Sequence, residues 1–480
     1  MPRLAANTRW SSRAPEVECP ALSGRSILFL LACIGNPRCT KACQCPREGP
    51  SAGWVDRAAG QGYTRGERSE SLAFSAHDRT ILRDLARRVA AVANEPVMAE
   101  RRRMWKRHNA LERVRPMVLI FPEGAWQELL PQSALECEDE RARRMEWALR
   151  SRLYYHEHLH DDTVVEGEWV VRKVVRNSGW GLEPRRIPAT EARGAWKFDP
   201  VIRQPSDLGK LRFPEVEYDG EATERNFQEA CDLFGDILTV KLKGVSHISF
   251  HLMAIYTRLR GLEEVMLDMV ANPSMLHDAM AFLEEGYRRL VAQYEELNLL
   301  SLNNDGTYHS SGGNGYTDEL PAPGFDPAHV RPCDMWASAE AQELALVSPE
   351  MHYEFALQYE KRLLEPFGLN GYGCCEDLTR KLGYVLEIPR IRRISISPFA
   401  DVEKCAEQLD RRAIFSWKPH PSHLVGNFSP ERIRDYIRHT LEVTRGCVVE
   451  MILKDTHTCE HHPERFTVWS RIARDLAERF

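Results

Sequence analysis

The feature that most constrains this chain of 480 residues is a regular alternation of short apolar runs and helical segments along its C-terminal half. Each run has the length of a buried strand and is followed by a segment with the period of an amphipathic helix. The runs occupy residues 299–303, 368–373, 393–397, 413–417 and 447–453. Because parallel strands need crossover connections, which are usually helices, this alternation predicts a parallel sheet.

Five consecutive units of this kind favour a closed (β/α)8 TIM barrel over an open doubly wound sheet. An earlier apolar run, residues 117–121, is closed by Pro122 and is typical of one more buried strand. A long helical stretch over residues 252–298 is broken by Pro273. No G-x-G-x-x-G motif follows any strand, so nothing supports a dinucleotide-binding sheet.

The chain ahead of the first strand has a different character. Residues 1–70 are rich in Arg, Ser, Gly, Pro and Cys and show no sustained period, which predicts a disordered leader or sequence upstream of the true start. Residues 71–114 have a basic helical pattern and are expected to form an N-terminal helical extension. Residues 115–480 would then form the barrel.

Composition narrows the possible partners. A net charge of −6 gives no general attraction to nucleic acid or to an anionic membrane. No run of about 18 apolar residues exists, so no membrane span is expected. Five of the 13 cysteines precede residue 46 and the others are scattered, unlike the dense cysteines of a small secreted protein. We therefore expect a reduced, cytoplasmic protein.

Polar residues follow the predicted strands, at the carboxyl ends where a barrel of this kind places its active site. Aspartates at two of these ends are candidates for proton transfer, and other polar residues are candidates for contact with a substrate. The candidate catalytic residues are Asp305 and Asp455, and the candidate substrate contacts are Asn304, Lys418, His420 and Arg193. Arg193 is included because it follows a glycine-rich turn and could bind an anionic group.

Cysteine and histidine residues gather after two of the strands. Thiolate and imidazole are the ligands that zinc prefers, and residues far apart in sequence converge at one end of a closed barrel. The candidate zinc ligands are Cys374, Cys459, His457 and Glu376. The alternative is that Cys374 and the adjacent Cys375 are small core residues, since free cysteine is commonly buried.

The order of several short motifs resembles uroporphyrinogen decarboxylase and its cobamide-dependent methyltransferase relatives. The motifs are Arg115-Pro116-Met117, Arg260-Gly261-Leu262-Glu263-Glu264, Asn272-Pro273, and the close of the chain from Gly426-Asn427 through Cys459 to Phe466. Each motif is loose, and together they extend over about three quarters of the chain. The resemblance implies a (β/α)8 barrel of the uroporphyrinogen decarboxylase-like type.

The methylcobamide:thiol methyltransferases of this superfamily carry a zinc site of the form His-x-Cys … Cys. Cys459, followed by Pro463, is similar to the last ligand and Cys374 to the earlier cysteine, whereas Tyr372 replaces the histidine. Cys375, Glu376 or His457 could supply the missing ligand. The resemblance therefore implies an enzyme in which zinc activates a substrate thiol, and the thiol takes a methyl group from a methylcobamide on a separate corrinoid protein. A homodimer is a further possibility.

Two other functions stay open. One is decarboxylation of uroporphyrinogen or another tetrapyrrole, although the R-Q-A-G-R-Y-like segment of that branch is not present in the sequence. The other is a non-catalytic barrel that binds a tetrapyrrole or corrinoid, which the loss of the histidine at Tyr372 would allow. The glycine-rich loop at residues 312–316 is expected to be either a mobile substrate loop or a simple surface connection.

Overall fold

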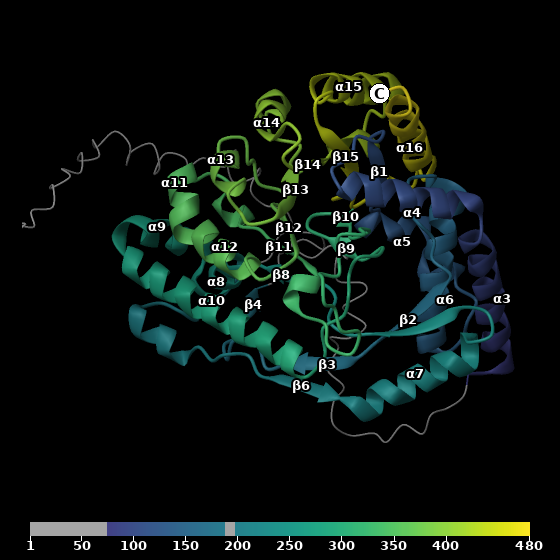
Figure 1. The fold of residues 1–480 in the computed structure, drawn as a ribbon, viewed down its shortest axis with the longest axis horizontal. Helices are drawn as coiled ribbons and strands as arrows, with labels where there is room; N and C mark the ends of the chain where they lie inside the picture. Colours follow the sequence, from purple (N-terminus) through teal and green to yellow (C-terminus); the bar gives the residue numbers. More distant parts are fainter. Residues whose placement is uncertain (1–73, 188–196) are drawn as a thin grey trace, which may run out of the picture. The chain divides into compact units, whose positions relative to one another are not determined.

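The computed structural model describes residues 74–187 and 197–480 (Figure 1). The expected leader, residues 1–70, and the candidate Arg193 lie outside the described residues. All described residues belong to one compact unit. None of the helices in these two ranges combines the length and the apolar character that a membrane span requires.

The centre of this unit is a sheet of seven parallel strands. Its order is β1-β15-β14-β13-β12-β11-β8, and every neighbouring pair is parallel. The strands are β1 (Met117–Ile120), β8 (Ser249–Phe250), β11 (Trp336–Ala339), β12 (Leu369–Tyr372), β13 (Ile391–Ile396), β14 (Ile414–Trp417) and β15 (Val448–Leu453). The first strand thus pairs with the last, with Met117 opposite Glu450. The predicted parallel α/β arrangement is confirmed.

The strand predicted at residues 299–303 forms only a single bridge, between Val245 and Leu300. Beyond this bridge, the Asn303 side chain makes the hydrogen bonds that the backbone of a strand would make. Its amide donates to the carbonyls of Ser246 and Trp336 at 2.9 and 3.0 Å, and its oxygen accepts from the Trp336 N–H at 2.9 Å. In the described ranges no ladder joins β8 to β1, so the expected closure into eight strands is not found.

The outer edge of β1 is closed by two carboxylates instead of a strand. The N–H groups of Val118 and Ile120 donate to Asp162 and Asp161, each at 2.9 Å, and the Asp162 N–H donates back to the Val118 carbonyl. Arg115 holds the buried Asp162 carboxylate at 2.6 Å. Because an unpaired buried N–H costs about 1–3 kcal/mol, these contacts stabilise an edge that would otherwise be unsatisfied.

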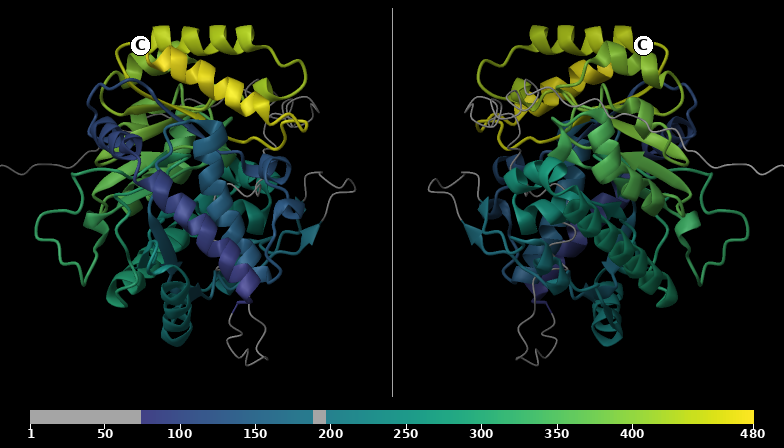
Figure 2. Two further views of the ribbon diagram at one scale, coloured as in Figure 1. Left: turned by 90° about the vertical axis from the view of Figure 1, so that its right-hand side faces the viewer. Right: turned by 90° about the vertical axis from the view of Figure 1, so that its left-hand side faces the viewer.

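Helices cover the sheet (Figures 1 and 2). The helical stretch predicted at residues 252–298 is three helices, because Gly261 adopts a φ of 97° between the first two and Pro273 begins the third. The helices are α8 (Leu252–Arg260), α9 (Leu262–Ala271), α10 (Pro273–Glu296), α11 (Pro349–His352), α12 (Gln358–Leu364), α13 (Leu382–Val385), α14 (Val402–Leu409), α15 (Pro430–Val443) and α16 (Glu464–Ala477). Helix α10 contacts α8, α9 and α12, and α15 lies beside α16.

The N-terminal part of the described chain forms a second apolar cluster, in which α3 packs against α6 and α7, and α7 packs against β2. Its helices are α3 (Ala76–Ala93), α4 (Pro96–Asn109), α5 (Trp126–Leu129), α6 (Glu140–Tyr154) and α7 (Gly220–Phe234). Strands β2 (Glu168–Arg172) and β7 (Thr239–Lys243) pair in parallel, whereas β3 (Val174–Asn177) with β6 (Val216–Asp219) and β4 (Arg186–Ile187) with β5 (Lys197–Phe198) pair antiparallel. Helices α3 and α4 precede β1, within the range 71–114 for which the sequence predicts a helical extension.

Two segments lie against the inner side chains of the sheet. One is the hairpin of β9 (Tyr308–His309) and β10 (Gly313–Asn314). A Cβ atom on Gly313 would lie 2.2 Å from the Arg393 guanidinium carbon, so glycine is needed for this close approach. Residues 311–317 are all buried, so the expectation of a simple surface connection at 312–316 is wrong, whereas a mobile substrate loop stays a prediction.

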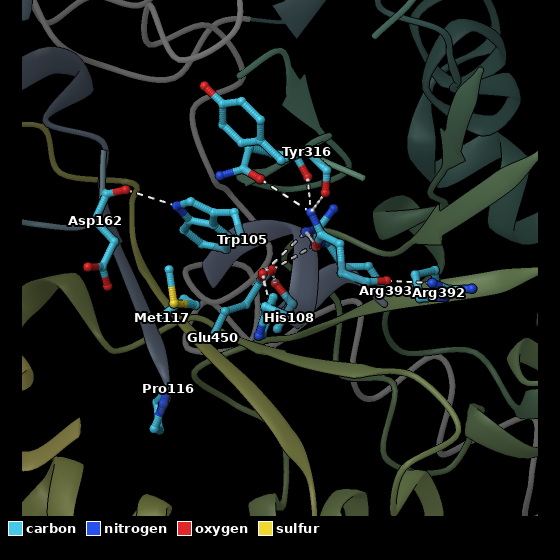
Figure 3. A network of polar contacts seen from close by, with 12 residues as sticks. Trp105, His108, Pro116, Met117, Asp162, Tyr316, Arg392, Arg393 and Glu450 are labelled. Atoms are coloured by element: carbon cyan, nitrogen blue, oxygen red, sulfur yellow. Dashed lines mark hydrogen bonds and ion pairs between the residues drawn. The ribbon is translucent and has the colours of Figure 1, made fainter. Parts of the chain in front are cut away.

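The other segment is the end of α4, which a buried polar network joins to two strands (Figure 3). The Glu450 carboxylate accepts from His108 Nε2 at 3.0 Å and from Arg393 Nε at 2.8 Å. The Arg393 guanidinium also donates to Asn109 Oδ1 at 2.8 Å. Burial raises the pKa of Glu450, but Arg393 and His108 lower it well below its usual value, so this carboxylate is charged and paired.

Candidate active site

Four side chains from the ends of two strands meet at the carboxyl side of the sheet. Cys374 and Cys375 follow β12, and their sulfur atoms lie 3.5 Å apart. Asp455 follows β15, with Oδ2 at 3.8 Å from Cys375 Sγ. Lys454 Nζ lies 3.9 Å from Cys374 Sγ and 3.6 Å from Asp455 Oδ1. We call these four residues the thiol–lysine cluster.

The local backbone explains why the cluster forms. Gly373 has a φ of 90°, which turns the chain sharply as it leaves β12. The turn is then fixed by its neighbours, because the Cys374 N–H donates to Glu376 at 2.8 Å and the Cys374 carbonyl accepts from Ser395 Oγ at 2.8 Å. Asp455 has a φ of 59°, so the chain also bends directly after β15. Both bends bring polar side chains to one edge.

The hairpin adds two groups that the sequence did not single out. Ser311 Oγ lies 3.6 Å from Cys374 Sγ and accepts from Lys454 Nζ at 3.2 Å. Tyr308, on the same hairpin, is partly buried, and burial raises the pKa of its hydroxyl above the usual value, which keeps the phenol protonated. Both residues lie several positions beyond the strand predicted at residues 299–303, so a search directly after the strand ends did not reach them.

Glu123 is a third residue that was missed. It follows β1 and Pro122, and its φ of 48° places it in the left-handed region. Burial raises the pKa of Glu123 to about 8, while Lys454 opposes this rise and Asp455 adds to it. Because Glu123 follows an apolar strand as the other candidates do, the same search at the end of β1 could have identified it.

The charges of the cluster follow from its surroundings. Burial lowers the pKa of Lys454, but Cys374, Tyr308 and Asp455 raise it well above its usual value, so the amine stays an ammonium. The hydrogen bond from Cys375 and burial raise the pKa of Cys374, and Lys454 acts against that rise. The site therefore presents two partly exposed thiols beside a fixed positive charge.

Behind Cys374 lies a group of buried carboxyl side chains. Burial and Glu340 raise the pKa of Glu376 to about 7, and burial raises the pKa of Glu360 to about 8. Tyr372, which stands in place of the family histidine, donates its hydroxyl to Glu360 at 2.8 Å and lies 3.0 Å from His352 Nε2. Tyr372 thus belongs to this buried group and not to the thiol–lysine cluster.

Of the four expected zinc ligands, Cys374 and Glu376 lie together, but Cys459 and His457 do not join them. The Cys459 thiol donates to Glu128 Oε2 at 3.1 Å, away from the contacts of Cys374. His457 is exposed and lies beside Gly124. Within residues 74–187 and 197–480 no group of three or more His, Cys, Asp and Glu side chains is arranged to hold a metal ion.

The other candidates are dispersed. Asp305 pairs with Lys243 at 2.6 Å, and the Asn304 amide donates to the Leu320 carbonyl at 2.8 Å. Lys418 is buried and donates to the Ser416 side chain at 2.6 Å, and burial lowers its pKa to about 7. Asp305, Asn304 and Lys418 therefore already have protein partners.

His420 is the substrate candidate that faces open space. It lines a cavity of about 360 Å³ at the carboxyl ends of β13 and β14, together with Pro398, His423, Asn427, Ser429 and Arg432. Its ring lies 5.8 Å from Phe399, whose side chain is 61% exposed. A cavity lined by imidazole, amide and guanidinium groups suits a polar small molecule.

Comparison with known proteins finds similarity to solved structures alone. No family model matches the chain, and no curated protein matches it. Among solved structures, a methyltransferase from Methanosarcina mazei is similar over 78% of this chain and 97% of that chain, with 12% identity and a TM-score of 0.44. A likeness at this score does not define a family for the chain.

Proposed function

We propose that this chain is a methyltransferase that moves a methyl group from a methylcobamide, held by a separate corrinoid protein, to the sulfur of a small thiol. The thiol–lysine cluster is its proposed reaction centre, and the α/β sheet is a variant of the uroporphyrinogen decarboxylase-type barrel. The observation that carries the proposal is the meeting of Cys374, Cys375, Lys454 and Asp455 within 4 Å contacts at the strand ends.

Transfer of a methyl group to a thiol requires a thiolate, because the thiolate is the nucleophile. In the proposal the Asp455 carboxylate takes the proton of the acceptor thiol, and the Lys454 ammonium stabilises the sulfur anion that remains. The sulfur would then displace the cobamide from the methyl carbon: the S–C bond forms as the Co–C bond breaks, the cobamide of the corrinoid protein leaves with that electron pair, and the proton stays on Asp455. The cavity beside His420 is the proposed binding place for the rest of the acceptor.

Zinc is the part of the family resemblance that the described residues do not fit. Cys459 donates its thiol to Glu128, and Cys374 contacts Cys375 and Lys454 instead. A buried ammonium at 3.9 Å from Cys374 Sγ supplies the positive charge that a metal would otherwise provide. No step of the proposal passes through a metal, and zinc binding stays a prediction for the test below.

The test is transfer from free methylcobalamin to a panel of small thiols by the full chain, with methylated thiol measured by mass spectrometry. We expect Asp455→Asn, which removes the proton acceptor, and Lys454→Met, which removes the group that stabilises the anion, each to lower the rate by on the order of 100-fold. Cys231→Ser, on α7 outside the cluster, is the matched control and should keep the full rate.

Cys459→Ser separates this proposal from the zinc site that the resemblance implies. The present proposal expects Cys459→Ser to keep its rate and the purified chain to contain no stoichiometric zinc. If zinc is present at about one per chain and is lost in Cys459→Ser, the metal mechanism replaces this one. No transfer to any thiol, with turnover of uroporphyrinogen instead, would sink methyl transfer and favour the decarboxylase.

A further inference from the structure

The two adjacent cysteines carry an inference that does not depend on the proposed function. We propose that Cys374 and Cys375 are a modification site, at which a hydroperoxide converts the two thiols into a disulfide between neighbouring residues. The observation is their geometry: the sulfur atoms already lie 3.5 Å apart, and both residues are partly exposed to solvent.

The surroundings assign different roles to the two sulfur atoms. Cys374 lies 3.9 Å from the Lys454 ammonium, which stabilises a thiolate and can protonate an oxygen leaving group. Cys375 lies 3.8 Å from the Asp455 carboxylate, which can accept its proton. Cys374 is therefore the thiol that attacks the peroxide, and Cys375 is the thiol that resolves the product.

The chemistry balances with the hydroperoxide as the only oxidant. Cys374 sulfur attacks the terminal oxygen, the O–O bond breaks, and a sulfenic acid and an alcohol form, the thiol proton passing to the alcohol oxygen. Cys375 sulfur then attacks Cys374 sulfur and expels the hydroxyl group, which leaves as water with the proton of Cys375. Two thiols and one hydroperoxide thus give one disulfide, one alcohol and one water.

A disulfide between adjacent residues closes a small ring through the peptide bond that joins them, so the backbone of the pair has to adjust as the S–S bond forms. Gly373, with its φ of 90°, precedes the pair, and glycine adjusts its backbone with little steric cost. The turn leaves β12 just before the pair, so the sheet register need not change. Cys231 and Cys333 are also partly exposed, but they lie on separate segments and serve as internal controls.

The experiment treats the reduced full chain with hydrogen peroxide and maps cysteine oxidation by mass spectrometry after alkylation. We expect the peptide that contains residues 374 and 375 to lose two hydrogens, to resist alkylation and to recover with dithiothreitol. Cys375→Ser should stop at a sulfenic acid on Cys374 that dimedone captures. Lys454→Met should slow the reaction about tenfold, the factor that one pKa unit of thiolate population represents.

Each other outcome overturns the assignment. A pair that stays reduced while Cys231 or Cys333 is oxidised would show that the cluster does not activate Cys374. Disulfides between two chains, or direct oxidation of Cys374 to sulfinic acid in the unmodified protein, would show that Cys375 does not resolve the intermediate. Because the main readout uses the unmodified chain, it holds even if a variant folds poorly, and it is separable from any loss of methyl transfer.

Discussion

Tyr372 lies outside the site that the sequence predicts for it and belongs to a different group of side chains. The sequence places it where a histidine ligand is expected, two residues before Cys374. Its side chain instead lies fully buried on the far side of the turn, where its hydroxyl contacts Glu360 and His352. A carboxyl group buried this deeply is stable only when it is neutral or paired, so Glu360 controls the pH response of this region.

Replacing Glu360 by glutamine should therefore change stability in a pH-dependent way. The folded pKa of about 8 lies above the usual value of 4.5, so the folded state holds a proton that the unfolded state releases between these values. The stability from that proton is complete below pH 4.5 and is lost as pH rises through 8. At pH 9 Glu360→Gln should be more stable than the unmodified chain by roughly 2 kcal/mol or more, since one pKa unit is worth ~1.4 kcal/mol.

Urea unfolding at pH 5 and pH 9 measures this difference. At pH 5 the variant and the unmodified chain should be nearly equal, because the native carboxyl group is already neutral there. The exposed Glu365, just after α12, provides the control Glu365→Gln, which should respond equally at both pH values. A Glu360→Gln variant that is destabilised at pH 9 would contradict the assignment of a neutral carboxyl group.

At the level of elements, the β9–β10 hairpin is the feature that pattern analysis could not predict. Its glycines are typical of an exposed loop, and the sequence contains no sign that they lie against Arg393 and Ile452. Those contacts arise only when β13 and β15 are already in place on the two sides of β14. The strands themselves could be predicted, because continuous apolar runs bounded by Pro and Gly are a strong local signal.

Gly313→Ala should destabilise the fold through this hairpin. The added Cβ would lie 2.2 Å from the Arg393 guanidinium carbon, and Arg393 cannot move aside because it is buried and bound to Glu450. We expect a loss of about 1–3 kcal/mol in the free energy of unfolding, the usual effect of overpacking a core. Gly383→Ala is the matched control, since no atom lies within 4 Å of its Cβ position and it lies in helix α13.

Chemical denaturation of both variants tests this prediction. Gly383→Ala should be neutral or more stable by up to about 1 kcal/mol, because alanine is the better helix former. Equal stability of Gly313→Ala and the unmodified chain would mean that the hairpin can move away from the sheet. In that case the contact of Ser311 with Cys374 would also be lost, and the cluster would be open on that side.

Across the whole molecule, the buried network in Figure 3 joins the helical extension to the sheet. His108, Arg393 and Glu450 come from α4, β13 and β15, and all three side chains are nearly inaccessible to solvent. The buried Glu450 carboxylate loses a hydrogen-bond donor when the extension is not in place, because His108 Nε2 lies 3.0 Å from it. The extension is thus part of the core and not an appendage.

His108→Ala should for this reason destabilise the entire unit by roughly 2–4 kcal/mol, through a cavity and a lost hydrogen bond to a buried carboxylate. His77→Ala on α3 is the control, because His77 is exposed and should change stability by less than about 0.5 kcal/mol. Thermal unfolding should show one transition that moves as a whole in His108→Ala. Separate transitions for the extension and the sheet would contradict a shared core.

From the sequence we could predict the parallel sheet, its helices and the common position of Cys374 and Asp455, each for a physical reason. Cys374 and Asp455 could be assigned to one place because carboxyl ends of parallel strands share an edge. The partner of Cys459 could not be predicted, since its contact with Glu128 depends on where the short helix α5 lies after β1. The strand predicted at residues 299–303 does not form, because the Asn303 side chain makes the hydrogen bonds that the backbone of a strand would make.

The pairing of β1 with β15 also determines when the molecule can be completed during synthesis. Because Met117 pairs with Glu450, the edge of β1 that faces β15 stays unpaired on the ribosome until almost the entire chain has emerged. Such long-range pairing is slow and leaves an aggregation-prone edge exposed in the meantime. A nascent chain of this protein is therefore a natural client for chaperones that hold unpaired strands, and premature termination before residue 448 leaves β1 with no partner on that side.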